Sequence, residues 1–235
     1  MTRNNIDSAL IRLDFVPIDE LNESLPKAIR DSVDKKFSEN EFREVNNSNI
    51  ELSPAGEVLN KEIQKMREWH FFSPQTTQRI ILTQSSLVLK CNGSDYSSFE
   101  DFVNSYASVC DALFATYPNT TITRIGLRYM NKFQEDDDSI ATCYLKDILS
   151  TPVAERVRIM TIIERKLQSH QLRMQYGLFN PDYPSVDVKK EIILDMDAYS
   201  NGLFYSDELA SLLDELHSTV EAEYCKFVSR KASEQ

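Results

Sequence analysis

Two stretches of the sequence consist of strand-like runs separated by turns that are too short to contain a helix. One covers residues 67–93 and is interrupted at residues 73–74 and 84–86, and the other covers residues 157–179 with a turn near residues 168–170. The Ser73-Pro74 pair and the Gln84-Ser85-Ser86 run are typical of hairpin turns. Because hairpins connect antiparallel neighbours, these stretches predict antiparallel meanders and not a doubly wound parallel sheet.

Amphipathic helical patterns follow the meanders. Residues 97–117 carry apolar side chains at helical spacing, with Ser97 or Ser98 as N-cap and Pro118 as the stop. Residues 206–231 repeat this design, with Ser206 as the expected cap. The sequence therefore predicts an α+β fold in which helices pack on one face of one or more antiparallel meander sheets.

Four further segments complete the predicted elements. Residues 9–15 alternate as a half-buried strand, and residues 19–37 predict a long amphipathic helix with Asp19 as N-cap. From residue 39 to residue 68 the signals weaken: residues 46–49 predict a turn, residues 50–53 allow a short strand, and residues 54–69 show no clear period. These residues together predict a variable excursion, and residues 143–150 predict a short helix. The acidic run at 135–138 reads as a solvated loop, not as a magnesium site.

The length and apolar content suit a single folded unit. The chain has 235 residues, of which 41% are hydrophobic, so residues 1–235 are expected to form one α+β domain with a substantial core. The order of meander followed by helix occurs twice. This order leaves open a duplication into two tightly packed halves, about 1–135 and 136–235.

Composition excludes several classes of protein. Twenty-six basic against 37 acidic residues give a net charge of −11, which opposes attraction to nucleic acids and to anionic membranes. No apolar run is long enough to span a bilayer, and the four cysteines form no C-x-x-C pair. With five glycines there is no dinucleotide or triphosphate loop motif. We therefore expect a cytoplasmic protein without cofactor, metal or membrane contact.

The segment TRIGLRYMNKF, residues 123–133, holds the main candidate site. Its alternation turns Ile125, Leu127, Tyr129 and Phe133 toward a core and Arg124, Gly126, Arg128 and Met130 toward the other face. The two arginine Cα atoms lie ~13 Å apart at ~3.3 Å per residue, with a gap over the glycine between them. The arginines either bind an external anion or acidic partner segment, or pair internally, for instance with Asp14. Basic residues of other predicted strands could extend this surface, among them Arg79, Lys90, Arg158, Arg165 and Arg173.

Two carboxylates form a weaker candidate site. Asp195 and Asp197 are two residues apart in the predicted strand 188–199, so they share one face. Such a pair could act in acid–base catalysis, although no histidine or lysine lies near it in the sequence. The three histidines, His70, His170 and His217, are isolated and predict packed or turn positions and no metal site.

Five segments taken in order resemble a sporadically distributed family of functionally uncharacterised prokaryotic proteins of about 250 residues. These are NNIDSALIRLDF, EWHFF, YSSFEDF, RIGLRYMNKF and LHSTVEAEYCKFVS. The most specific part is an R-x-G-L-R-Y-x-N core, which adds Asn131 to Arg124, Gly126 and Arg128 as predicted binding residues. The resemblance implies a gene carried in defence or mobile-element loci, and it supplies no catalytic residues.

Three functions remain open from the sequence. The first is a non-enzymatic binding or accessory module that engages a protein or peptide partner through its sheet face, with Arg124 and Arg128 as anchors. The second is a nucleic-acid-binding protein that uses a basic sheet face. The third is an enzyme that acts on a small anionic substrate gripped by the arginines, with Asp195 or Asp197 as acid–base group. A homo-oligomer is compatible with each of them.

Overall fold

Nine strands of the described chain form one antiparallel sheet. The computed structural model describes residues 5–33, 36–52, 58–134, 140, 144, 158–179 and 191–228. The strand order is β2-β3-β4-β5-β1-β6-β9-β8-β7, with β1 and β6 at the centre. The strands are β1 (Ile6–Phe15), β2 (Glu39–Leu52), β3 (Val58–Phe72), β4 (Arg79–Leu82), β5 (Ser86–Asn92), β6 (Ile122–Gln134), β7 (Arg158–Lys166), β8 (Gln171–Phe179) and β9 (Glu191–Phe204).

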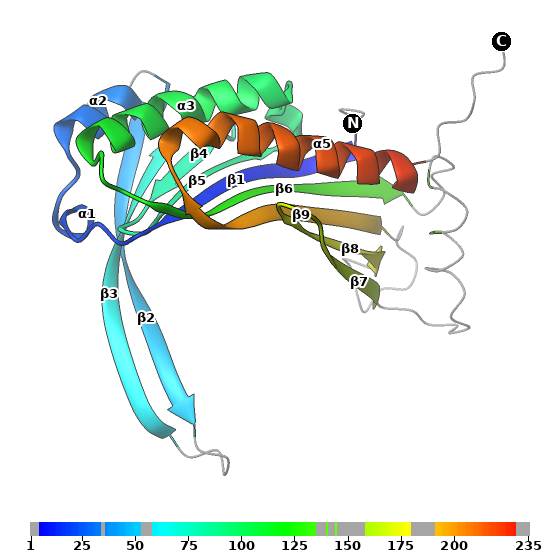
Figure 1. Cartoon of the computed structure of the whole chain (residues 1–235), viewed down its shortest axis with the longest axis horizontal. Coiled ribbons are helices and arrows are strands. Elements are labelled where there is room, and N and C mark those ends of the chain that lie inside the picture. Colours follow the sequence, from blue (N-terminus) through cyan, green and yellow to red (C-terminus); the bar gives the residue numbers. More distant parts are fainter. Residues whose placement is uncertain are drawn as a thin grey trace.

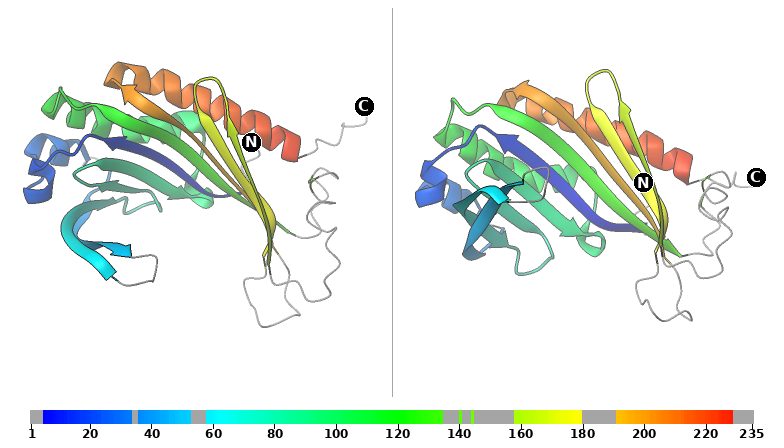
Figure 2. Two further views of the ribbon diagram at one scale, coloured as in Figure 1. Left: turned by 60° about the horizontal axis from the view of Figure 1, so that its bottom comes forward. Right: turned by 90° about the horizontal axis from the view of Figure 1, so that it is seen from below.

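Helices cover one face of this sheet, as the sequence predicts. The helices are α1 (Glu20–Glu23), α2 (Lys27–Val33), α3 (Phe99–Thr116) and α5 (Leu209–Phe227), and Figure 1 shows α2, α3 and α5 on the same side of the strands. The view from below in Figure 2 looks onto the opposite face of the sheet. We call this opposite face, which carries Arg12, Arg124, Arg128, Asp195 and Asp197, the polar face.

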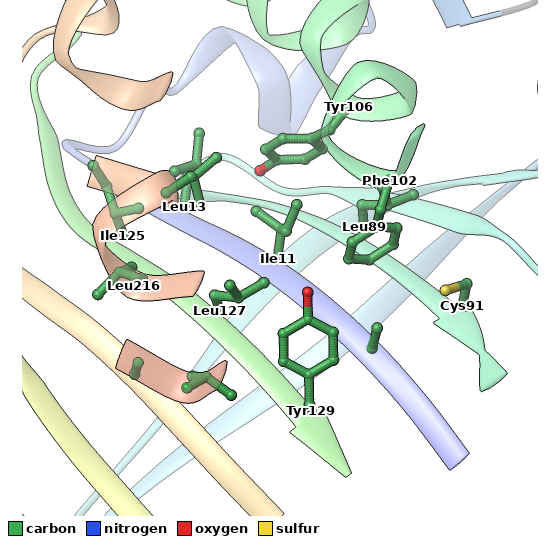
Figure 3. Packing of buried hydrophobic residues seen from close by; sticks show 14 of the residues in the cluster. Ile11, Leu13, Leu89, Cys91, Phe102, Tyr106, Ile125, Leu127, Tyr129 and Leu216 are labelled. Carbon is green, nitrogen blue, oxygen red and sulfur yellow. The ribbon is translucent and has the colours of Figure 1, made fainter. Parts of the chain in front are cut away.

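The core lies between the helices and the inner face of the sheet. Alternate residues of β1 and β6, such as Ile11 and Leu127, are fully buried there. Figure 3 shows them packed against Phe102 of α3 and Leu216 of α5. Burial of such side chains contributes about 1.5–3 kcal/mol each. The period-2 pattern of the strands thus fixes which face receives the helices.

The two long helices begin close to their predicted positions. Ser98 caps α3, because its Oγ accepts a hydrogen bond from the backbone N–H of Asp101 at 3.1 Å. The last helix is preceded by a 3₁₀ turn at Ser206–Glu208, and the Glu208 carboxylate accepts a bond from the backbone N–H of Tyr205 at 2.8 Å. The cap predicted at Ser206 is therefore replaced by the hydrogen bond between the Glu208 carboxylate and the backbone N–H of Tyr205.

The prediction of a single helix over residues 19–37 is wrong. The chain forms α1 and α2 instead, and Ser24 between them is extended with φ −151° and ψ 154°. Pro26 explains the break, because proline disfavours helical backbone in the residue before it and cannot donate within a helix. The apolar stripe survives the interruption, since Leu21, Ile29 and Val33 are all buried.

The prediction of a variable excursion over residues 39–68 is also wrong. β2 and β3 form a long hairpin there, and only Trp69–Phe72 of β3 pairs with β4. Residues 58–68 therefore extend past β4 in a two-stranded arm of about 35 Å, which bends away from the helices in Figure 1. An arm without a third strand in the described chain has no continuous buried face, so its sequence lacks the usual alternation.

The remaining predictions concern the other turns and the proposed duplication. The turn near residues 168–170 is confirmed, because it joins β7 to β8 in register. The acidic run at 135–138 and nearly all of the predicted helix at 143–150 lie outside the described residues. In both parts of the chain a first strand, β1 or β6, pairs with the last strand of a meander, β5 or β9, and a helix follows. This repeated order divides the chain between α3 and β6, earlier than residue 135, and the duplication itself stays a prediction.

No helix in the described parts of the chain combines the length and apolar character needed to cross a bilayer.

Candidate functional site

The strand register gathers charged residues in the middle of the polar face. On this face, Arg124 and Arg128 of β6 lie between Asp14 of β1 and Asp195 and Asp197 of β9. Arg128 is directly opposite Asp197, and Asp197 is directly opposite Arg173 of β8. We call Arg124, Arg128, Asp195 and Asp197 the arginine–aspartate cluster.

Arg124 is held by contacts within the molecule. Its Nη2 lies 3.3 Å from Asp197 Oδ2 and its Nη1 lies 3.7 Å from Asp14 Oδ2. Its guanidinium carbon lies 4.7 Å from the ring centroid of Tyr199, which is a cation–π distance. The internal pairing with Asp14 that the sequence suggested is confirmed. Only 26% of the Arg124 side chain remains exposed.

The space above Gly126 is filled by Arg124 itself. A Cβ atom added to Gly126 would lie 3.5 Å from Arg124 Nη2 and 3.6 Å from Tyr199 Cβ, both ordinary contact distances. The prediction of an open gap between the two arginines is therefore wrong. The reason is that the long Arg124 side chain folds along the strand toward Asp197 and Tyr199, and covers the glycine.

Arg128 forms the strongest pair of the cluster. Its Nε donates to Asp195 Oδ1 at 2.8 Å and its Nη2 donates to Asp195 Oδ2 at 2.6 Å, a bidentate arrangement. This hydrogen bonding raises the pKa of Arg128. The Asp195 side chain is 11% exposed whereas that of Arg128 is 44% exposed, so the guanidinium retains a free side toward solvent.

Asp197 is the most perturbed carboxylate of the cluster. Its burial beneath the surrounding side chains raises its pKa, although Arg124, Arg128 and Arg173 act in the opposite direction. The nearby Asp195 charge raises it further. Desolvation of Asp197 thus outweighs the attraction of the three nearby arginines.

A shallow depression lies beside the cluster. Arg128, Arg173, Gln175, Asp195 and Asp197 line it, and its volume is about 60 Å³. Arg173 is 49% exposed, and its Nε lies 3.5 Å from Glu164 Oε1, a loose pair. Small-molecule sites usually measure about 300–1,000 Å³, so this depression suits one carboxylate-sized group.

Basic residues continue from this depression across the sheet. The register aligns residues of neighbouring strands in a row across the sheet. In order from β4 to β8, these residues are Arg79, Lys90, Leu10, Arg128, Asp197 and Arg173. Arg79 and Arg173 are five strand spacings apart, about 24 Å. Lys90 is exposed and forms no ion pair with any residue of the described chain, and Arg79 lies over the ring of Phe72 at 5.7 Å. We call Arg79, Lys90, Arg128 and Arg173 the basic row.

Other predicted members of the site lie elsewhere. Asn131 is fully buried on the inner face, where its Nδ2 donates to the backbone oxygen of Leu194 at 3.4 Å. Its assignment to a surface shared with the arginines is therefore wrong. Arg165 also points toward the helices and pairs with Glu223 of α5 at 2.6 Å. The Arg158 side chain lies outside the described part of the structure.

Sequence reasoning missed Tyr199 and Gln175 as members of this surface. Tyr199 continues the alternation of Asp195 and Asp197, and that period could have identified it. Gln175 could be placed only through the register of β8 with β9, which aligns it with Asp195. In the described residues, no three His, Cys, Asp or Glu side chains gather in the manner of metal ligands.

Comparison of the chain with protein-family models and with curated proteins finds no match. The family resemblance inferred from the R-x-G-L-R-Y-x-N segment therefore stays a prediction.

Proposed function

We propose that the protein is a non-enzymatic binding module that captures an acidic segment of a partner protein on the polar face of its sheet. The observation that carries the proposal is the basic row, in which Arg128 and Arg173 keep 44% and 49% of their side chains exposed on the face of the sheet that none of the described helices covers. Lys90 extends the same row without an ion pair in the described chain. In a chain with a net charge of −11, such a local concentration of cations supports recognition of a specific acidic partner.

The cluster residues have distinct roles in this proposal. Arg128 and Arg173 contact the partner's carboxylates, because their exposed donors flank the depression. Arg124 is a positioning residue, since its guanidinium is engaged by Asp197, Asp14 and Tyr199. The sequence predicted Arg124 and Arg128 as the two anchors. In this proposal Arg173 takes the place of Arg124.

The same geometry supports a protein partner over the two alternatives. Tyr129 and Phe133 are buried, so neither ring can stack on the bases of a nucleic acid. The arginines and aspartates are close enough for catalysis. However, a depression of about 60 Å³ cannot enclose a typical substrate. The composition leads us to expect the partner in the cytoplasm, and the family resemblance leads us to expect it to be encoded by the same defence or mobile-element locus.

A binding titration tests the proposal. Fluorescence anisotropy of a labelled deca-glutamate peptide is measured at about 50 mM and about 300 mM salt, against a deca-glutamine peptide and a single-stranded oligothymidine. The proposal expects salt-sensitive binding of deca-glutamate alone. The R173Q/K90Q double variant should weaken this binding about tenfold, because both side chains lie on the row and neither holds a buried partner.

The matched control is K27Q, which removes an exposed cation from α2 on the helix side of the molecule. It should bind deca-glutamate within about twofold of the wild type. Absence of deca-glutamate binding at low salt refutes the proposal, and so does equal weakening by K27Q. Preferred binding of oligothymidine would instead support the nucleic-acid alternative.

A further inference from the structure

A second cavity lies on the face of the sheet that carries the helices, next to α2 and beside the base of the β2–β3 arm. Its volume is about 440 Å³, within the usual range for small-molecule sites. The residues that line it include Leu25, Arg30, Asn40, Phe42, Trp69 and Phe71. We call it the tryptophan pocket, because it contains the single tryptophan of the chain.

The local sequence explains how this pocket forms. The break at Pro26 ends α1 and starts α2 in a new direction, which leaves Leu25 and Arg30 facing the sheet edge. β2 is the edge strand, and its register places Phe42 opposite Trp69 and Asn40 opposite Phe71 on one face. The pocket is thus open along an edge that no other described strand covers.

Three of the residues that line the pocket are aromatic: Phe42, Trp69 and Phe71. The Phe42 and Trp69 ring centroids lie 5.9 Å apart at an interplanar angle of 40°, and 55% of Phe42 is exposed. Trp69 is fixed in place, because its Nε1–H donates to the backbone oxygen of Leu21 at 2.9 Å. Phe71 is buried below them. A fixed indole beside an exposed phenyl ring offers a flat ligand a stacking surface.

Among the described residues, Arg30 lines the pocket, and a second cation, Arg67, lies over the Phe42 ring at 5.7 Å from its centroid. Arg30 is exposed and forms no ion pair with any residue in the described chain, whereas its helix neighbour Lys27 is paired with Asp31. Glu41 lies between Asn40 and Phe42 on β2, so its side chain turns to the other face of the strand, where Arg43 Nε donates to its Oε1 at 2.8 Å. This hydrogen bond lowers the pKa of Glu41, so the carboxylate stays charged at neutral pH.

A single guanidinium fork matches a carboxylate through two parallel hydrogen bonds. We propose that the tryptophan pocket binds a small flat aromatic carboxylate, whose ring stacks on Phe42 and Trp69 and whose carboxylate pairs with Arg30.

The fluorescence emission of Trp69 can report ligand binding directly. This emission is recorded while the full chain is titrated with phenylacetate, benzoate or 2-naphthoate, and the corresponding neutral amide serves as the matched ligand control. At least one carboxylate should change the emission with saturation at a dissociation constant on the order of 1 mM, typical of a ligand of this size. Its amide should bind about tenfold more weakly.

Variants then assign the contacts. R30Q should remove the preference for carboxylate over amide, and F42A should weaken both ligands, because these exposed side chains supply the ion pair and the stacking surface. K27Q, one turn away on α2, should behave as the wild type. The proposal is overturned if none of the three carboxylates gives a saturable change below about 10 mM, or if R30Q retains the wild-type preference.

Discussion

The Arg128–Asp195 pair predicts an asymmetric response to mutation. In R128Q, Asp195 keeps its charge at a side chain that is 11% exposed, and it loses both guanidinium donors. Leaving a nearly buried carboxylate without its partner costs about 2 kcal/mol, less than for a fully buried pair because Arg128 itself is partly solvated. In D195N, Arg128 can turn into water and the substituted amide can still accept one bond, so the cost is about 1 kcal/mol.

The double variant isolates the interaction. R128Q/D195N removes both charges and should cost about 1 kcal/mol, which gives a coupling energy of about 2 kcal/mol between the two residues. For a domain of this size the R128Q loss corresponds to a fall in Tm of about 4–8 °C. Both quantities come from urea and thermal unfolding at pH 7, with K27Q as a neutral surface control.

Two outcomes would refute this reasoning. A coupling energy below about 0.5 kcal/mol would mean that the bidentate pair is an exposed surface contact. A D195N cost equal to or larger than that of R128Q would mean that the carboxylate is well hydrated without arginine. Either result would make Arg128 freely available to a partner, and would also remove the structural reason for its orientation.

Three further predictions concern the polar face, the glycines and the core. Because burial raises the pKa of Asp197, its contribution to stability is greatest below the ordinary carboxyl pKa and is lost as pH rises through the raised value. D197N should therefore gain stability relative to the wild type from about pH 3.5 to pH 7 in urea unfolding, and a pH-independent difference would contradict this. G93A should cost about 3 kcal/mol, because the added Cβ would lie 1.5 Å from a backbone oxygen of β1, whereas G126A should be nearly neutral in the same assay. Y106F should cost about 1 kcal/mol by urea unfolding, since the hydroxyl donates to a backbone oxygen of β5 at 2.6 Å in the fully buried core shown in Figure 3, and an unchanged midpoint would count against this bond.

The sequence alone determined the layers of this protein. Alternation in residues 9–15 and 122–133 placed Ile11 and Leu127 inside and Arg124 and Arg128 outside, and the structure confirms each of these positions. Turn residues determined the hairpins β4–β5 and β7–β8, although not β2–β3, and the apolar stripes determined the two long helices. These features are local, because side-chain direction in a strand or helix depends on steps of two or about four residues.

Only the tertiary structure decided which side chains meet. Arg128 and Asp195 are 67 residues apart, and their contact depends on the register between β6 and β9, which includes a shift between Ile122 and Arg124. The same holds for Arg124, whose side chain fills the space over Gly126 because Asp197 and Tyr199 lie on the adjacent strand. The tryptophan pocket depends in turn on how α2 and the edge strand β2 come together. Register and packing result from long-range strand pairing, and no local period in the sequence encodes them.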